Sequence, residues 1–339
     1  MRSLFLIGLA ALLGAAPALA QPGSTLAQVR ARGSLVCGAD IGLLGFSQRD
    51  AQGVVRGLDA DTCRAVAAAV LGDADKVTFT GGSRQQQLMA LREGRIELAA
   101  SNLTQTMARD VDLGLSPTAV NYYDGQGFLV PASPPVANLA GLDGKRICIT
   151  SGTTTEMGLA DAARRLSIQV TPVVVGDAAS LAAAYREGRC DAMTSDISEL
   201  LVLRQTGTTD PAAHVLLPDI ISREPLGPLV RDGDSQWRSI VFWVVNLLLE
   251  AEAREITAAN AEARKNDPSA IVRRMMGGMP GFGTPLGLAD DWGFQVISQV
   301  GNYGEIYERN LGEGSSLKID RGLNALWNRG GLMYPIPMR

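Results

Sequence analysis

Three polar segments of this sequence carry the residue types that hold a charged small molecule. Residues 101–110 offer several hydroxyl groups and Arg109, whose planar guanidinium can bind a carboxylate through two parallel hydrogen bonds, as a lysine cannot. Residues 151–156 open a predicted helix, where free backbone N–H groups attract anions and Gly152 lets a ligand approach the backbone closely. Asp196, in the third segment, has the charge to bind an ammonium group. Together the segments suit a zwitterion, a molecule with one charge of each sign.

Each segment also has an ordinary structural interpretation. Arg109 could be a surface residue paired with Asp110. Thr153 and Glu156 match a capping box, in which two side chains hydrogen-bond the first backbone N–H groups of a helix. Asp196 could cap the helix that follows it. The choice between these interpretations depends on the elements that position the segments.

Strand-like and helix-like stretches alternate along the chain, which indicates an α/β fold. Predicted strands lie at residues 35–37, 77–79, 96–100, 146–150 and 169–174, and predicted helices at residues 59–71, 83–93, 154–166 and 177–187. In open α/β sheets, ligands bind beyond the carboxyl ends of the strands. Residues 101–110 and 195–199 both follow predicted strands, so this rule places both at ligand-binding positions.

One pattern occurs twice along the chain. Residues 91–102 and 185–196 each read as a helix end, a glycine stop, a short apolar strand and a polar loop. Two copies are too few for a repeat array. They favour two similar lobes whose polar loops face each other across a cleft. Coincidence is the alternative, since a helix, a glycine and a strand often follow one another.

The first residues have the pattern of a secretory signal peptide. Arg2 gives a positive start, residues 4–13 are apolar but too few to span a membrane, and Ala18-Leu19-Ala20 is a small-residue cleavage site. A buried N-terminal helix is the alternative. We expect a signal peptide over residues 1–20, followed by an exported chain that is long enough for two domains.

Charge, histidine and cysteine content exclude several function classes. The chain has 31 Lys plus Arg against 35 Asp plus Glu and no long basic block, so nucleic acid is not expected as a partner. The chain has one histidine, His214, and a single histidine excludes most Ser-His-Asp and Cys-His catalytic sites. His214 lies in a Pro-containing stretch that is typical of a surface loop. Four cysteines in an exported chain favour disulfides over a metal site, and they are Cys37, Cys63, Cys148 and Cys190. No cofactor or metal is expected.

Further stretches carry a family pattern through nearly all of the chain after residue 20. They are residues 37–38, 45–47, 57–61, 63–65, 121–127, 147–148, 151–156, 188–191, 224–228, 302–305, 318–327 and 330–331. In this combination the sequence resembles the general L-amino-acid-binding proteins of the polar amino-acid ABC importers, within family 3 of the bacterial periplasmic solute-binding proteins. The sequence departs from that pattern at Leu43, Gly81-Gly82, Gln87 and Gln105, where an aromatic residue, Pro-Leu, Arg and Trp are usual. These departures predict an altered wall around the ligand's side chain.

The resemblance implies two lobes, joined by two hinge strands, that close on the ligand. Lobe 1 is expected at residues 21–130, lobe 2 at residues 131–222, and the return to lobe 1 with a helical C-terminal extension at residues 223–339. The chain would then cross between the lobes near Pro131 and Arg223. The extension should wrap lobe 1 without touching the ligand. The buried face of its long helix is expected to consist of Trp237, Phe242, Trp243, Leu247 and Leu248.

The resemblance also implies the residues that bind the ligand. Asn102, Thr104 and Arg109 would hold it from lobe 1, and Thr154 and Asp196 would hold it from lobe 2. Arg109, helped by the backbone N–H of Thr154, would bind the α-carboxylate of an amino acid. Asp196 would bind the α-ammonium group.

The expected protein is therefore a periplasmic monomer, and not an enzyme, that captures a free L-amino acid for an inner-membrane ABC permease. A dehydratase-like enzyme acting on small carboxylates is one alternative, and it would need a general acid or base such as Glu156. A periplasmic ligand sensor, with the same binding chemistry, is the other. Because a disulfide between the lobes would prevent closure, the cysteines should pair within lobes, as Cys37–Cys63 and Cys148–Cys190.

Overall fold

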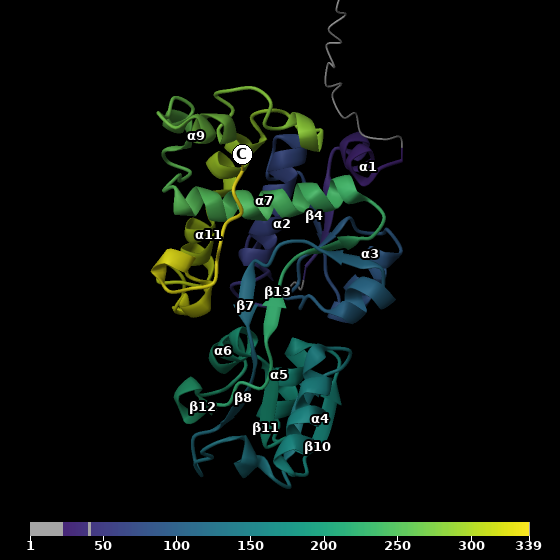
Figure 1. Ribbon diagram of the computed structural model, residues 1–339. Coiled ribbons are helices and arrows are strands. Elements are labelled where there is room, and N and C mark those ends of the chain that lie inside the picture. Colours follow the sequence, from purple (N-terminus) through teal and green to yellow (C-terminus); the bar gives the residue numbers. More distant parts are fainter. Residues whose placement is uncertain (1–22, 40–41, 339) are drawn as a thin grey trace, which may run out of the picture.

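The computed structural model describes residues 23–39 and 42–338, and it divides the chain into two lobes joined by a pair of strands (Figure 1). The signal peptide expected over residues 1–20 lies outside the described residues. Each lobe is built on one five-stranded mixed sheet with helices packed against it. The predicted α/β fold with two lobes and a helical extension is confirmed.

Lobe 1 contains the first sheet, whose strands lie in the order β4 (Val77–Thr80), β1 (Leu35–Gly38), β5 (Leu98–Ala99), β14 (Leu229–Arg231) and β6 (Leu115–Pro117). Strands β4, β1 and β5 run parallel, whereas β14 is antiparallel to both of its neighbours. A small hairpin, β2 (Gln48–Arg49) and β3 (Val55–Arg56), lies outside this sheet. The strand that returns from lobe 2 therefore completes the sheet that the N-terminal strands begin.

The helices of lobe 1 begin and end at the signals that the sequence provides. They are α1 (Thr25–Arg32), α2 (Leu58–Leu71) and α3 (Arg84–Arg92). Helix α2 ends at Gly72 in the left-handed conformation. Helix α3 begins with a capping box, in which the Ser83 side chain accepts the N–H of Gln86 while the Gln86 side chain accepts the N–H of Ser83. The position of α3 matters for function because its first turn faces lobe 2.

Two antiparallel strands, β7 (Tyr122–Asp124) and β13 (Glu224–Leu226), connect the lobes. Their register places Glu224 opposite Asp124. Strand β8 (Gln126–Pro131) pairs in the second sheet, so the chain crosses to lobe 2 at β7, before the boundary expected near Pro131. Only Gly125 separates β7 from β8, so one extended segment serves as hinge strand and then as sheet strand.

Lobe 2 contains the second sheet, in the order β10 (Thr171–Val175), β9 (Arg146–Thr150), β11 (Ala192–Asp196), β8 and β12 (His214–Leu216). Its helices are α4 (Thr154–Leu166), α5 (Ala178–Arg186) and α6 (Ile197–Thr206). The parallel strands β10, β9 and β11 end toward lobe 1, with β11 running directly into α6. His214 begins β12 and is half-buried, with its Nδ1 2.9 Å from the Tyr185 hydroxyl, so the expected surface loop residue is a strand residue.

The C-terminal extension is helical and packs mainly on lobe 1. Its helices are α7 (Ser235–Ala253), α8 (Ala261–Arg264), α9 (Ala270–Met275), α10 (Trp292–Val300) and α11 (Tyr303–Asn310). Helices α7, α10 and α11 contact α2. On α7, Trp237, Leu247 and Leu248 are buried, whereas Phe242 and Trp243 are half-buried, and of these two Trp243 packs against the core. The extension also reaches lobe 2, because the Nε2 of Gln205 on α6 donates to the carbonyl of Leu317 at 3.3 Å.

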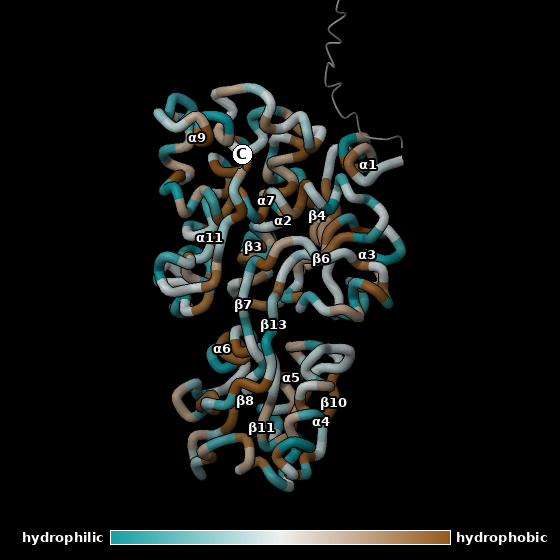
Figure 2. Tube along the Cα trace, viewed as in Figure 1, coloured by the Kyte–Doolittle hydropathy of each residue, from teal (hydrophilic) through white to brown (hydrophobic). Residues whose placement is uncertain are grey.

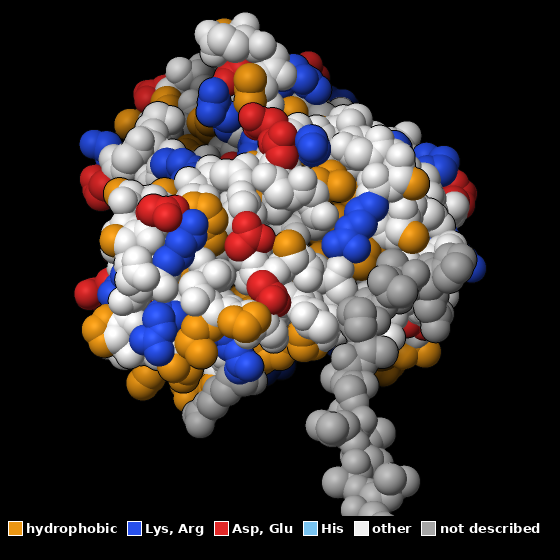
Figure 3. All heavy atoms as spheres, turned by 90° about the horizontal axis from the view of Figure 1, so that it is seen from above, with side chains coloured by type: hydrophobic (Ala, Val, Ile, Leu, Met, Phe, Trp, Pro, Cys, Tyr) orange, Lys and Arg blue, Asp and Glu red, His pale blue; other side chains and the backbone are white. Residues whose placement is uncertain are grey.

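Short 3₁₀ turns complete the secondary structure, at Leu139–Leu142, Pro211–Ala213, Thr284–Leu286, Gly322–Asn324 and Trp327–Arg329. Apolar residues gather in the interior of each lobe, and the chain between the lobes is more polar (Figure 2). Acidic and basic side chains are interspersed over the end of lobe 1 (Figure 3). Within the described ranges, no helix combines the length and the apolar character that a membrane crossing requires.

The four cysteines form two disulfides, Cys37–Cys63 in lobe 1 and Cys148–Cys190 in lobe 2. The predicted pairing is confirmed. Each bond joins two elements of one lobe, so neither restrains the movement of one lobe relative to the other. In lobe 1 the bond ties β1 to α2, and in lobe 2 it ties β9 to the segment before β11.

Candidate ligand site

Arg109 lies between the lobes and is not a surface residue. It belongs to a π-helical turn, Ala108–Asp112, and only 7% of its surface is exposed. Its Nη1 donates to the carbonyl of Thr104 at 2.5 Å. Burial, with a further contribution from the nearby Arg84, lowers the pKa of Arg109 to about 10. Asp196 and Glu224 oppose that shift, so both acids lie close enough to act on the guanidinium.

The other two lobe 1 residues flank the same turn of the chain. Asn102 adopts a left-handed backbone conformation, with φ of 47°, and its N–H donates to the Asp59 carboxylate at 3.0 Å. Its side chain is buried, and neither amide atom has a hydrogen-bond partner in the part of the chain that the structure describes. Thr104 donates its hydroxyl to Glu224 at 2.6 Å. Asn102 therefore keeps an amide donor and an amide acceptor that no described residue uses.

Asp196 faces these residues from lobe 2. It is the last residue of β11 and precedes α6, but its side chain makes no capping hydrogen bond to that helix. The carboxyl group is buried, and its Oδ1 has no donor among the described residues. Burial raises the pKa of Asp196 well above its ordinary value, Asp124 raises it further, and Arg84 opposes the shift. The capping interpretation is therefore wrong, and the carboxyl group is held where a cation would stabilise its charge.

The start of α4 supplies the remaining predicted residue, Thr154, but not the predicted capping box. Thr153 donates its hydroxyl to the Thr150 carbonyl at 2.7 Å and makes no side-chain cap. Glu156 instead accepts the N–H of Gly152 at 2.8 Å. Thr154 donates its hydroxyl to Glu224 at 3.0 Å, which ties the first turn of this lobe 2 helix to the hinge.

Glu224 is a residue of the site that sequence reasoning missed. It lies on hinge strand β13, and its Oε2 accepts the hydroxyls of Thr104 from lobe 1 and Thr154 from lobe 2. Its Oε1 accepts the Ser222 hydroxyl at 2.5 Å. The sequence marked residues 224–228 only as part of the family pattern. The placement of an acid beside the expected return to lobe 1 was the signal that could have identified it.

The second missed feature is a buried ion pair between the lobes. Arg84 Nη2, at the start of α3, lies 2.8 Å from Glu199 Oε2 in the first turn of α6. The side chains are 8% and 0% exposed. Arg84 stands one helical turn before Gln87, the position at which the resemblance leads one to expect an arginine. The two lobes also touch beside this pair, because a Cβ on Gly152 would lie 3.3 Å from the Gln85 side chain.

The structure therefore brings the predicted residues together at the junction of the lobes. Arg109 and Asp196 act on each other electrostatically from opposite lobes. Thr104 and Thr154 share one carboxylate, and Asn102 follows Ser101, whose carbonyl accepts the Arg84 Nε. This arrangement offers one cationic and one anionic group, both buried, to a small molecule held between the lobes.

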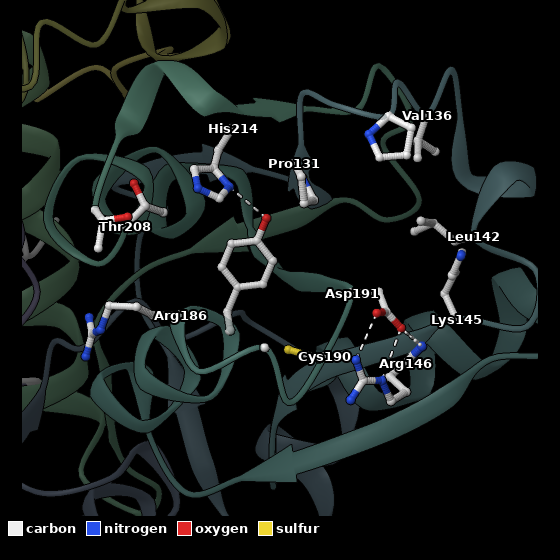
Figure 4. Close-up of a pocket in the computed structure, with 14 residues that line it drawn as sticks. Pro131, Val136, Leu142, Lys145, Arg146, Arg186, Cys190, Asp191, Thr208 and His214 are labelled. Atoms are coloured by element: carbon white, nitrogen blue, oxygen red, sulfur yellow. Dashed lines mark hydrogen bonds and ion pairs between the residues drawn. The ribbon is translucent and has the colours of Figure 1, made fainter.

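A different pocket, of about 520 Å³, lies within lobe 2 (Figure 4). Its lining includes Lys145, Arg146 and Asp191, which stand at the amino ends of β9 and β11, and the Tyr185–His214 hydrogen bond. The predicted residues follow the carboxyl ends of the strands, where ligands of open α/β sheets bind. The pocket is therefore at the opposite edge of the sheet from the candidate site.

Known proteins resemble this chain in sequence and in overall fold. The model of the bacterial extracellular solute-binding proteins, family 3, matches residues 35–242. The chain is 47% identical to the general L-amino acid-binding periplasmic protein AapJ of Rhizobium johnstonii, with 98% of both chains covered. It is 45% identical to the glutamate/glutamine/aspartate/asparagine-binding protein BztA of Rhodobacter capsulatus, covering 98% of this chain and 97% of that one. A solved structure, an ABC transporter periplasmic binding protein from Brucella ovis with glutathione bound, has a TM-score of 0.91 and 45% identity, covering 94% of this chain and 100% of that chain.

Proposed function

This chain belongs to family 3 of the bacterial extracellular solute-binding proteins, and on that basis we propose that it captures a free L-amino acid between its lobes. It then delivers the amino acid to an ABC importer in the inner membrane. The protein works in the periplasm after its first 20 residues are removed. Export to that compartment also suits the two disulfides, which persist where the surroundings are oxidising.

One observation carries the proposal: two buried groups of opposite charge, Arg109 and Asp196, come from opposite lobes. A free amino acid has the complementary pair of charges on adjacent atoms. The α-carboxylate would bind Arg109 with the backbone N–H of Thr154, and the α-ammonium would bind Asp196. Because each lobe supplies one charge, a ligand would hold the lobes together.

The alternatives are a dehydratase-like enzyme and a ligand sensor. The enzyme would need a general acid or base. Its candidate, Glu156, accepts the N–H of Gly152 and so stabilises the start of α4. A sensor would use the same binding chemistry, so the partner protein distinguishes it from a transport component. Pull-down of the inner-membrane partner, a permease or a receptor, decides between the two.

Thermal-shift measurements with each common L-amino acid test the proposal directly. An amino acid at one hundred times its dissociation constant should add about 2.7 kcal/mol to the free energy of unfolding. Glutathione belongs in the panel, because its γ-glutamyl end carries the same α-ammonium and α-carboxylate groups. If no amino acid and no glutathione raised the melting temperature, the proposed function would be wrong.

Two substitutions test the assignment of the charges. Arg109→Ala and Asp196→Ala should each weaken binding about 30- to several-thousand-fold, since each leaves one ligand charge buried and unpaired. Matched controls are Arg95→Ala and Asp161→Ala, whose side chains are exposed on lobe 1 and lobe 2. Small-angle scattering should show Asp196→Ala accumulating in an open, weakly liganded form. If a variant binds the amino acid with an affinity within about threefold of that of wild type, the substituted residue does not belong to the site.

A further inference from the structure

Glu199 is the most deeply buried acid at the junction of the lobes, and its two carboxylate oxygens have different environments. Oε2 accepts hydrogen bonds from Arg84 Nη2 at 2.8 Å and from the Ser195 hydroxyl at 2.9 Å. Oε1 has no donor within the described residues, although the side chain is 0% exposed. A buried carboxylate oxygen without a donor is strongly unfavourable. Glu199 is therefore held in place by one oxygen while the other remains available.

The free oxygen of Glu199 has a counterpart on the same turn of α6. Asp196 precedes the helix by one residue and Glu199 lies three positions later, a spacing that places both side chains on one face. The Oδ1 of Asp196 is likewise buried and has no donor among the residues described. The two carboxyl groups lie close enough for Glu199 to raise the pKa of Asp196. Two neighbouring, negatively charged hydrogen-bond acceptors thus lack donors in the part of the chain that the structure describes.

An ammonium group matches this pair of acceptors. It carries three N–H donors and a positive charge, so it can donate to two carboxylates at once. A hydroxyl group has one donor and no charge, and it would leave one of the two carboxylates unpaired. The ion pair with Arg84, which reaches Glu199 from lobe 1, accounts for the orientation of the Glu199 side chain.

We propose that Glu199 is a ligand-binding residue that accepts, together with Asp196, the α-ammonium group of the bound amino acid. Arg84 is a positioning residue that holds Glu199 across the junction of the lobes. The inference rests on the proposed function, because it assigns a second acceptor to the same ligand group. It also adds a charge to the site that the five predicted residues do not include.

That added charge defines the class of amino acid that the site accepts. With an ammonium bound, the junction contains two basic side chains, Arg84 and Arg109, and four acidic ones, Asp124, Asp196, Glu199 and Glu224. Arg84 already forms an ion pair with Glu199, so it would not serve as the partner of a ligand carboxylate. A second carboxylate on the ligand would add negative charge to a buried cluster that already has an excess of it. The site should therefore prefer L-glutamine to L-glutamate.

Calorimetric titration of the Glu199→Gln variant tests the proposal with paired probes. The probes are L-glutamine, L-glutamate and L-leucine, each with the matching acid that lacks the amino group. Glu199→Gln should weaken binding of an amino acid by about tenfold or more. It should change binding of the matching acid by less than about threefold, because that acid has no ammonium to lose an acceptor. The preference of wild type for L-glutamine over L-glutamate should shrink in the variant.

Controls separate this role from a purely structural one. Glu262→Gln makes the same substitution at an exposed position on α8 and should leave all affinities unchanged. Arg84→Lys retains the ion pair and should bind more tightly than Arg84→Ala. Equal weakening of an amino acid and its matching acid by Glu199→Gln, no weakening of either, or a wild-type preference for L-glutamate would overturn the inference. Wild type that bound none of the amino acids of the full panel would instead overturn the proposed function.

Discussion

Replacing Glu224 by glutamine should shift the protein toward its open form. The carboxylate Oε2 accepts one hydroxyl from each lobe, Thr104 at 2.6 Å and Thr154 at 3.0 Å. Glutamine has nearly the same shape, but it offers one acceptor oxygen, and its NH₂ group can only donate. At least one of the hydroxyls that share Oε2, or the Ser222 hydroxyl on Oε1, therefore loses its acceptor in Glu224→Gln.

The size of the effect follows from which bond crosses between the lobes. A hydrogen bond to a charged acceptor contributes about 1.5–3 kcal/mol. Thr104 stays beside the hinge in lobe 1, whereas Thr154 moves with lobe 2 and can be hydrated when the lobes separate. Loss of the Thr154 hydrogen bond thus raises the free energy of the closed form more than that of the open form. The equilibrium constant between the two forms should therefore shift by about 10- to 150-fold. Affinity for an amino acid should fall by a similar factor, because only the closed form surrounds it.

Small-angle scattering at saturating and at zero amino acid, combined with calorimetry, measures both quantities. Thr154→Val removes the lobe 2 donor and should reproduce most of the shift, while Thr104→Val should change the open fraction less. In the double variant Glu224→Gln/Thr154→Val the two effects should not add, since both remove the same bond. Equal effects of the two threonine variants, or weaker binding in Glu224→Gln with no change in the open fraction, would refute the reasoning.

Three further predictions concern pH, the disulfides and the extension. Burial raises the pKa of Asp196 well above its ordinary value, so a proton competes with the ligand's ammonium for that carboxylate. Burial also raises the pKa of the neighbouring Asp124, to about 6. Calorimetry should show affinity rising with pH as Asp196 loses its proton, and scanning calorimetry should show the ligand-free protein gaining stability as pH falls from about 6 toward 4, where Asp124 is protonated in the folded chain first. Cys148→Ser/Cys190→Ser should lower the free energy of unfolding by about 2–4 kcal/mol, seen by denaturant titration, while amino-acid binding survives. Truncation after Pro268 removes α9–α11, exposes α2 and α7, and should lower the melting temperature or the expression level.

Each of these three predictions has a result that contradicts it. An affinity that did not change between pH 5 and pH 8 would mean that no buried carboxyl group takes up a proton when the ligand leaves. If the disulfide variant lost amino-acid binding but kept its free energy of unfolding, the disulfide would be needed for binding and not for stability. A truncated protein that stayed folded but lost ligand affinity would make the extension part of the site.

Local features could be predicted from the sequence, and contacts between the lobes could not. The helix expected over residues 83–93 is present as α3, because the signals for its start and its end are contained in one segment. The Arg84–Glu199 pair joins residues 115 positions apart, and it exists only because the lobes meet. The position of the hinge was placed too late in the chain, near Pro131. The apolar residues of β8 have the same pattern whichever lobe's sheet they enter, so pattern alone cannot assign them.

The charged residues of the site show the same division. Arg109 was identified by its residue type within a polar loop, but its burial, which excludes a surface role, comes from packing. Thr153 and Glu156 had the spacing of a capping box, yet their side chains bond Thr150 and Gly152 instead. The spacing thus identified the segment correctly but predicted the wrong hydrogen bonds, because several acceptors compete for the same hydroxyl at the start of a helix.

The packing of the extension on lobe 1 also determines which part of the protein tryptophan fluorescence can monitor. All four tryptophans follow residue 234, with Trp237 and Trp292 in the lobe 1 core and Trp327 about half exposed. Lobe 2, from β8 to Ser222, contains no tryptophan, and Tyr185 is its one tyrosine. Tryptophan emission therefore follows lobe 1 and its extension, and separate melting of lobe 2 would pass almost unseen in it. A tryptophan introduced into lobe 2, with a dye on lobe 1 as energy acceptor, would allow the distance between the lobes to be followed by energy transfer as they close.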